Sequence, residues 1–313
     1  MATTTNITTT YAGEKAAGYV AAALLSANTI ENGGITVKPN VKFKEVLKRV
    51  STDDLLADGT CDFSATSTLT LDEKILEPET FQVNLQLCKE DFRSDWDAIE
   101  MGYSAFDELP ASFADFLIGH VAAKVAGKME QNIWQGVNAN AGEFDGFEVL
   151  LAADAELPAG QQIAAIAGGV DAGNVIAELG KVVDAIPTRL YGEEGLTLYV
   201  SSNVYRAYVR SLGGFGANGL GAAGVNAQGN NQAMGDLMFD GIPLFMCNGM
   251  SDDTAICTTK DNLFFGTGLA SDSQEVKVLD MADLDGSQNV RVIMRMTAGV
   301  QYAFAGDVVT YGI

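Results

Sequence analysis

A glycine-rich run after residue 212 is the first place where this sequence could bind a phosphate. Gly214, Gly216 and Gly219 have the GxGxxG spacing, in which small residues let the backbone approach a pyrophosphate. In a dinucleotide site such a run follows a strand and opens a helix, whereas here it follows a predicted helix and leads into more glycine. No GK[ST] motif is present, so the P-loop signature is missing as well. The pattern favours a surface loop over residues 213–229.

The other residues that could do chemistry form no catalytic pattern. Asp283–Gly286 resembles part of a calcium loop, but Met281 and Val292 stand where an EF-hand needs acidic ligands. The single histidine, His120, has no Ser, Cys or acidic residue close to it in sequence. The four cysteines form no CxxC pair, so we expect free thiols and no zinc site. We predict that the chain is not an enzyme and needs no cofactor or metal.

The clearest basic stretch lies between residues 38 and 49, in a chain that is otherwise acidic. The 41 Asp and Glu residues against 19 Lys and Arg residues give a formal net charge of −22, and such a surface repels phosphate backbones. Salt bridges to an acidic neighbouring subunit explain the basic stretch more simply than nucleic-acid binding does. The basic candidates for contacts between subunits are Lys42, Lys44, Lys48 and Arg49.

The element that carries these basic residues is predicted to be a long β-hairpin. Alternating apolar residues mark strands at both ends of Ile35–Cys88, the second of them at Phe81–Leu87. A polar stretch, Ser51–Thr68, separates the two strands. Because a two-stranded hairpin has little core, a long projecting one usually needs a partner to lie on.

The rest of the chain is predicted to mix helices and strands. The longest helix is expected over Pro110–Gly136, about 39 Å long, with Gly136 as its C-terminal cap. A helix over Asn174–Ile186, a strand over Leu196–Val200 and a helix over Val204–Leu212 indicate a mixed α/β lobe. Further strands follow, including a hairpin at Asp240-Gly241, two strands at Val290–Met296 and Val300–Phe304, and a last one at Val308–Tyr311.

The length of the chain bears on the number of lobes, and its N-terminal sequence bears on the cellular location. A chain of 313 residues exceeds one ordinary core, so two or three lobes are expected. The N-terminal residues lack the pattern of a signal peptide, and the apolar run Val20–Leu25 is too short to cross a membrane. We therefore expect a soluble protein that is made in the cytoplasm and does not bind membranes.

The order of these elements resembles the major capsid protein of tailed phages, which has the Hong Kong 97-type fold. Phe81–Trp96 looks like the returning hairpin strand and its link to the spine helix, and Phe113–Gly136 looks like the spine helix itself, with Glu130 and Gly136 near its end. Other segments resemble the following turn and the axial domain, namely Phe144–Phe147, Leu196–Gly214, Phe239–Met250 and Asn262–Gly268.

The resemblance implies an α+β fold divided as follows: an N-terminal arm and short helix (1–34), an extended hairpin (35–93), a peripheral domain with the spine helix (94–140), an axial domain (141–285), and terminal strands that return to the peripheral domain (286–313). The glycine-rich loop would then lie in the axial domain near the centre of each hexamer or pentamer, which adds Gly214, Gly216 and Gly219 to the candidate contact residues.

The implied function is a shell subunit. Copies of the chain would form hexamers and pentamers of an icosahedral phage head, which would enclose double-stranded DNA without binding it specifically. A separate scaffolding protein, a portal and decoration proteins would be its partners, assembly would occur in the host cytoplasm, and the mature location would be the virion. Two alternatives remain open from the sequence: the shell of an encapsulin-like compartment, and a nucleotide-dependent α/β enzyme that uses the glycine-rich loop.

Overall fold

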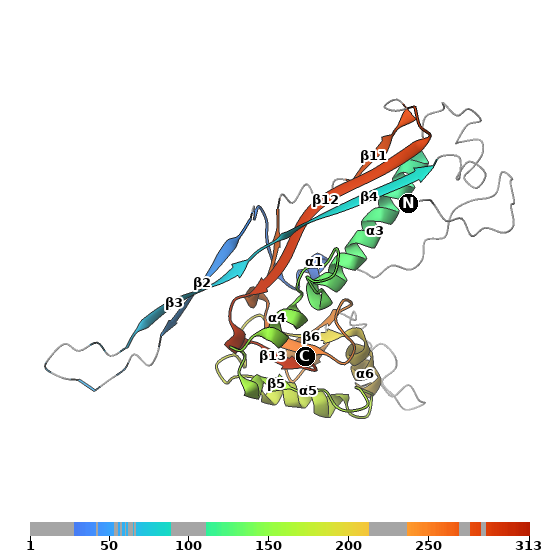
Figure 1. Cartoon of the computed structure of the whole chain (residues 1–313). Helices are drawn as coiled ribbons and strands as arrows, with labels where there is room; N and C mark the ends of the chain where they lie inside the picture. The colour runs from blue at the N-terminus through green and yellow to red at the C-terminus, as the bar shows by residue number, and fades with distance from the viewer. Residues whose placement is uncertain are drawn as a thin grey trace.

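The computed structural model shows two β-sheets, a projecting hairpin and several helices (Figure 1). The described residues are 28–41, 43–52, 56, 58, 59, 61, 65, 67–88, 111–212, 237–268, 276–282 and 286–313. Residues 1–27 of the predicted N-terminal arm and the glycine-rich loop at 213–229 lie outside these residues.

The hairpin is built from β2 (Glu45–Thr52) and β3 (Leu69–Leu76), which pair antiparallel. In Figure 1 the pair extends away from both sheets. The predicted return strand is wrong, because Phe81–Leu87 lies in β4 (Glu79–Cys88), which pairs with β12 (Asn289–Tyr302). The alternating pattern therefore marks a true strand, but it does not tell which strand is its partner.

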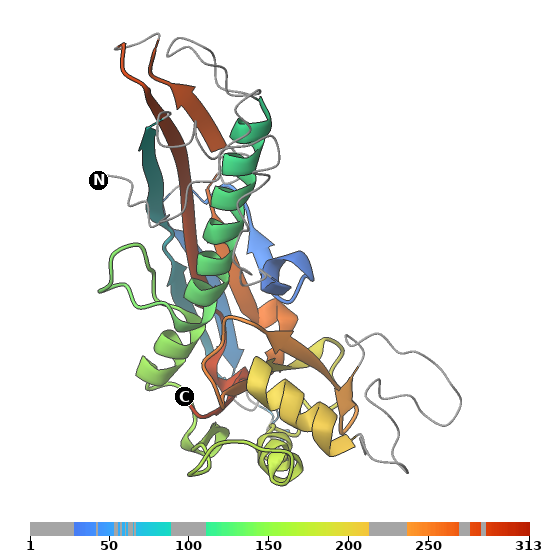
Figure 2. The ribbon, with the colours of Figure 1, turned by 90° about the vertical axis from the view of Figure 1, so that its right-hand side faces the viewer.

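β12 is the central strand of a five-stranded sheet. It pairs with β4 on one side and with β10 and β11 on the other, and β1 runs parallel to β10. The helix α3 (Ala111–Gln135) runs alongside this sheet (Figure 2), which confirms the predicted long helix. The remaining strands of the sheet are β1 (Thr36–Lys38), β10 (Leu263–Thr267) and β11 (Val276–Asp280).

A six-stranded sheet forms the second body of the fold, with the strand order β5-β13-β9-β6-β8-β7. Its strands are β5 (Gln162–Ile163), β6 (Leu196–Ser201), β7 (Met238–Phe239), β8 (Ile242–Cys247), β9 (Ala255–Thr259) and β13 (Val309–Tyr311). The helices α5 (Val175–Asp184) and α6 (Ser202–Leu212) pack on it through one apolar cluster. The predicted helix–strand–helix unit is confirmed, and so is the tight turn at Asp240-Gly241, where both residues have positive φ.

Strand pairing differs from the predicted domain order in two places. β10 and β11 fall within the segment predicted to be axial, yet both lie in the five-stranded sheet. β13 falls within the terminal segment, yet it lies in the six-stranded sheet between β5 and β9, while β12 is one strand where the sequence suggests two. Apolar alternation correctly predicts that these segments are strands. It does not predict their pairing, because the partner strands lie far away along the chain.

The C-terminal end of α3 lies where the two sheets meet. Trp134 is fully buried there, with its ring centroid 5.4 Å from that of Phe147 and 5.6 Å from that of Tyr199. Phe147 opens α4 (Phe147–Ala153), and Tyr199 lies on β6. This aromatic cluster therefore joins α3 and α4 to the six-stranded sheet. Three short 3-10 turns complete the described elements: η1 (Ala159–Gln161), η2 (Lys260–Asn262) and η4 (Ala305–Asp307).

A buried carboxylate on α3 ties the N-terminal segment to the same junction. Glu130 is completely buried and accepts hydrogen bonds from the backbone N–H of Thr29 (3.1 Å) and from the Thr29 hydroxyl. Trp134 Nε1 donates to that hydroxyl at 2.9 Å. Thr29 lies on the short helix α1 (Asn28–Glu31). Burial raises the pKa of Glu130, and these donors offset part of that rise.

Close backbone approaches at glycine also define this end of α3. A Cβ on Gly136 would lie 2.2 Å from the carbonyl oxygen of Phe144, and a Cβ on Gly249 would lie 2.1 Å from that of Glu130. Helix α3 ends directly before Gly136, as predicted, and the Gly136 N–H closes the last turn on the Asn132 carbonyl oxygen, but Gly136 does not have the positive φ of a left-handed cap. Its lack of a side chain instead admits the returning chain.

We expect Gly249→Ala to cost about 3 kcal/mol of unfolding free energy or more, because the new Cβ would meet rigid backbone of α3. Gly180→Ala is the control, since Gly180 lies inside α5 with nothing within 4 Å of the new Cβ, and it should gain about 0.5–1 kcal/mol. Urea unfolding of the two variants checks both values. Equal stabilities would contradict the close packing at Gly249.

Candidate assembly site

The hairpin has two faces of opposite character, and the strand register assigns each side chain to one of them. Directly opposite residues of an antiparallel pair share a face. Leu47 lies opposite Lys74 and Arg49 lies opposite Asp72, so these side chains share the face toward the body of the molecule. Val46 lies opposite Ile75, Lys48 opposite Glu73, Val50 opposite Leu71, and Thr52 opposite Leu69, and these pairs share the outer face.

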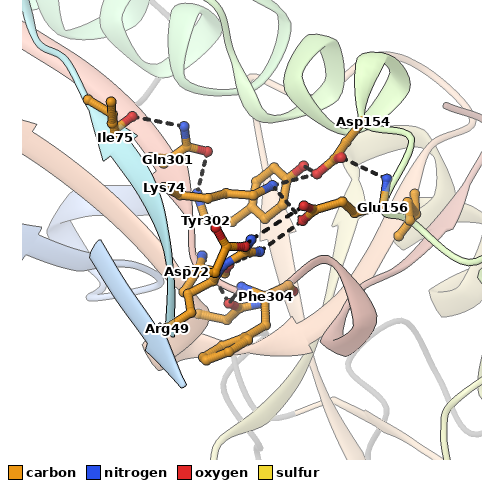
Figure 3. Close-up of polar contacts among 12 residues, drawn as sticks. Arg49, Asp72, Lys74, Ile75, Asp154, Glu156, Gln301, Tyr302 and Phe304 are labelled. Carbon is orange, nitrogen blue, oxygen red and sulfur yellow. Dashed lines mark hydrogen bonds and ion pairs between the residues drawn. The ribbon is translucent and has the colours of Figure 1, made fainter. Parts of the chain in front are cut away.

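Arg49 anchors the inner face. Its side chain is only 10% exposed, and its guanidinium forms an ion pair with Asp72 on the neighbouring strand. It also reaches Glu156, with Nη1 2.9 Å from Oε2, and donates to the carbonyl oxygen of Ala303 at 3.2 Å. Figure 3 shows these groups converging from the hairpin, from the loop after α4 and from the end of β12. One arginine thus fixes the hairpin to two other segments of the chain.

Lys74 provides the second anchor. Its Nζ lies 2.5 Å from Asp154 Oδ2, and both side chains are nearly buried. The same ammonium lies 4.0 Å from the ring centroid of Tyr302, whose hydroxyl donates to Asp154. Gln301 adds a hydrogen bond from Nε2 to the carbonyl oxygen of Ile75 at 3.0 Å (Figure 3). Lys74, Asp154 and Tyr302 form a compact unit that leaves little charge unpaired.

The pKa values reflect this arrangement. Burial would raise the pKa of Asp154, but the Lys74 ammonium and the Tyr302 hydroxyl outweigh it, and the pKa lies below its usual range. Burial and the hydrogen bond to Asp154 raise the pKa of Tyr302. At neutral pH the unit therefore holds an ionised Asp154 and a neutral Tyr302.

The chain passes from the hairpin into the five-stranded sheet at Pro78. Proline has no N–H for a strand ladder, so it separates β3 from β4 and lets the two strands take different partners. Gly299 and Gly266 admit this crossing closely: a Cβ on Gly299 would lie 2.9 Å from Pro78 Cα, and one on Gly266 would lie 2.9 Å from a methyl carbon of Leu76. The break at Pro78 explains why the predicted hairpin continues too far along the sequence.

The outer face of the hairpin is apolar and solvent-exposed. Its five large apolar side chains are between 41% and 71% exposed: Val46, Val50, Leu69, Leu71 and Ile75. The charged pair of Lys48 and Glu73 separates Val46 and Ile75 from the other three. Soluble proteins seldom expose so many large apolar side chains on one short element unless they bind a partner. An anchored inner face and an exposed apolar outer face are the features of a surface that packs against another molecule.

The predicted contact residues lie in different surroundings in the structure. Arg49 forms ion pairs with Asp72 and Glu156 of its own chain. Its contact with a neighbouring subunit remains a prediction. Lys44 pairs with Glu77 at 2.7 Å on the surface, and Lys48 is exposed on the outer face. Lys42 and the three candidate glycines, Gly214, Gly216 and Gly219, lie outside the described residues.

Sequence reasoning missed β3 and the acids that hold it. Leu69 and Leu71 alternate with polar residues, which is the signal for a strand, but the run is short and interrupted by charges at Asp72, Glu73 and Lys74. No sequence signal points to Asp154 and Glu156, which lie 80 residues or more from the groups they bind.

The cysteines and the possible metal ligands among the described residues form no reactive site. The four cysteines are free, with Cys247 and Cys257 buried and Cys61 exposed. Within the residues described, no cluster of three His, Cys, Asp or Glu side chains could hold a metal ion. Over the same part of the chain, no helix combines the length and apolar character that a membrane span requires.

Comparison of the whole structure with solved structures identifies the fold. The capsid protein of a native GTA particle superposes with a TM-score of 0.61 at 14% identity, covering 94% of this chain and 93% of that one. A chain from Mycobacterium phage Adephagia gives a TM-score of 0.58 at 18% identity, covering 94% of both chains. The capsid of Myoviridae phage XM1 gives 0.58 at 10% identity, covering 95% of both chains.

These likenesses extend over nearly the whole chain and show that it has the fold of phage capsid proteins, as the resemblance in sequence implied. The mixed helices and sheets agree with the predicted α+β class. No family model matches the chain, and no curated protein matches its sequence.

We expect Lys74→Met to lower the free energy of unfolding by about 2–3 kcal/mol, because it leaves the carboxylate of Asp154 buried without its cation. Lys44→Met is the matched control on the same hairpin, since the Lys44–Glu77 pair is more than half exposed, and it should change stability by about 0.5 kcal/mol or less. Urea unfolding checks both. A similar loss in the two variants would contradict the anchoring role of Lys74.

The anchor should also depend on pH. Because the pKa of Asp154 is lower in the folded protein than its ordinary value of 3.8, its contribution to stability is complete above the ordinary value and is lost as the pH falls through the folded value. The difference in unfolding free energy between the natural protein and Asp154→Asn should therefore be largest near pH 6–7 and shrink below about pH 4. A difference that stays constant from pH 7 to pH 3 would rule out this linkage.

Proposed function

We propose that this chain is the major capsid protein of a tailed phage and that its function is self-assembly into a closed shell. The observation that carries the proposal is the hairpin, which is fixed on one face by ion pairs of the nearly buried Arg49 and Lys74 and presents exposed apolar side chains on the other. The likeness of the whole chain to phage capsid structures supports the same conclusion.

The mechanism follows from the two faces of the hairpin. The outer apolar face lies against a second copy of the chain, which removes Val50, Leu71 and their neighbours from water. Burying the exposed halves of five such side chains is worth about 5 kcal/mol before ordering costs are subtracted. The anchor reduces that cost, because the hairpin is already held in one direction before it meets its partner.

Modest contacts suffice because each subunit makes several of them. In a closed shell every copy gives its hairpin to one neighbour and receives one from another, a head-to-tail contact that closes into rings. Multivalency then makes the assembly much more stable than any single contact. The rings in this proposal are the hexamers and pentamers of an icosahedral head that encloses double-stranded DNA.

The proposal assigns parts to the two bodies of the fold. The five-stranded sheet and α3 form the peripheral domain, and the six-stranded sheet with α5 and α6 forms the axial domain. A separate scaffolding protein, a portal and decoration proteins are the expected partners, and the mature protein resides in the virion. This role requires no catalytic residue and no cofactor.

Leu71→Asp tests the proposal, since it places a charge in the middle of the outer face without touching the anchored face. We expect the variant to fold normally and to lose nearly all particle formation, because the carboxylate would have to be buried against the neighbour. Ile176→Asp is the control, since Ile176 is similarly exposed but lies on α5, away from the hairpin. Electron microscopy and sedimentation of the purified variants provide the measurement.

The proposal fails if the natural protein, supplied with any scaffolding protein it needs, stays monomeric at every concentration. It also fails if Leu71→Asp assembles as well as Ile176→Asp does. Shells that contain one specific enzyme and no DNA would assign the chain to an encapsulin-like compartment instead.

A further inference from the structure

The five-stranded sheet has a polar face whose charge is opposite to that of the chain as a whole. In β12 the side chains of Val290, Val292 and Met294 are buried, so the alternating Arg291 and Arg295 point to the opposite, exposed face. The register with β4 places amide side chains beside them. This face includes Gln82, Asn84, Gln86, Arg291, Ile293 and Arg295.

The described side chains on this face of β4, β11 and β12 include no carboxylate. Lys277 of β11 lies opposite Ile293, between the two arginines, and adds a third cation. Arg291 Nε donates to Gln86 Oε1 at 3.2 Å, and no carboxylate among the residues described pairs with Arg291 or Arg295. A shallow hollow between the two strands is lined in part by Gln86, Arg291 and Ile293.

Seven of the twelve other lysines and arginines in the described residues are neutralised by carboxylates of the same chain. Ion pairs with neighbouring carboxylates hold Lys38, Lys44, Arg49, Lys74, Lys128, Lys181 and Arg189. In a chain with a formal net charge of −22, exposed arginines without a carboxylate nearby are the groups most available to an acidic partner.

We infer that this face is a contact for a second copy of the chain, and that it takes an acidic surface of that copy. Two copies repel each other over most of their surfaces, so a favourable contact must set the cations of one against the carboxylates of the other. The face cannot pair with itself, because cations would then meet cations. The contact is therefore head-to-tail, which is the kind that builds rings and shells.

The charge of the whole chain favours a protein partner over nucleic acid. With a formal net charge of −22, the surface around this face repels phosphate backbones. The two arginines lie about 13 Å apart along β12, so one carboxylate cannot serve both, and the partner must present at least two. This inference rests on the proposed self-assembly and adds to it the surface that makes the contact selective.

Charge reversal at the two arginines is the first test. We expect Arg291→Glu with Arg295→Glu to fold, because both side chains are exposed, and to reduce particle formation about tenfold or more at low ionic strength. The control is Arg206→Glu with Arg210→Glu, which makes the same change in net charge at two exposed arginines on α6. If the reversed protein does not fold, Arg291→Gln with Arg295→Gln replaces it.

Four results are informative. Loss of particles in the sheet variant with normal assembly of the control supports the inference, whereas equal assembly of the two variants overturns it and leaves the proposed function intact. Equal loss in both overturns it as well, since net charge alone would then be the cause. Failure of the natural protein to assemble would reject the proposed function itself.

Chemical coupling identifies the partner directly. Arg295→Lys keeps the charge and supplies an amine that a carbodiimide can join to a carboxylate in contact with it, and position 295 of the natural protein cannot react this way. Particles assembled from a mixture of ¹⁴N and ¹⁵N subunits should yield peptides that join Lys at position 295 of one isotope to an Asp or Glu of the other. If the crosslinked peptides always carry the same isotope, the contact lies within one subunit and the inference is overturned. The inference is also overturned if Arg295 is protected from an arginine-modifying reagent in DNA-filled particles but not in empty ones.

Discussion

The charged cluster beneath the hairpin decides the direction in which the hairpin projects from the molecule. Asp154 accepts hydrogen bonds from the Lys74 ammonium and the Tyr302 hydroxyl in a nearly buried space, and Arg49 joins the same region to Asp72 and Glu156. A two-stranded ribbon in water is only marginally stable. The cluster supplies the attachment that the ribbon lacks, so its outer face stays free for a partner.

Rigidity at the base of the hairpin is also what makes a large regular assembly physically reasonable. A shell of identical subunits requires each contact to form at nearly the same angle, and a freely moving arm would lose that angle and add an entropic cost at every contact. Pro78 and the glycines packed around it fix the crossing into the five-stranded sheet. The buried Glu130 and Trp134 do the same for the junction between the two sheets.

The elements with local signals could be predicted from the sequence, and the pairing between distant segments could not. The long helix α3, the unit of α5, β6 and α6, and the turn at Asp240-Gly241 follow from periodicity and turn chemistry near each residue. The alternation in β4 marks a strand, but the choice of β12 as its partner depends on residues 200 positions later. Arg49 shows the same limit for the site: its sequence context suits a neighbour's carboxylate as well as it suits Glu156 of its own chain.

The central claim is that the outer face of the hairpin is covered by a second copy of the chain, and electron cryomicroscopy of purified particles at side-chain resolution tests it most directly. A closed shell in which Val50, Leu71 and Ile75 of each subunit pack against a neighbouring subunit is the predicted result. A shell in which these side chains face solvent, or a preparation that contains no shells although its scaffolding partner is present, would contradict it.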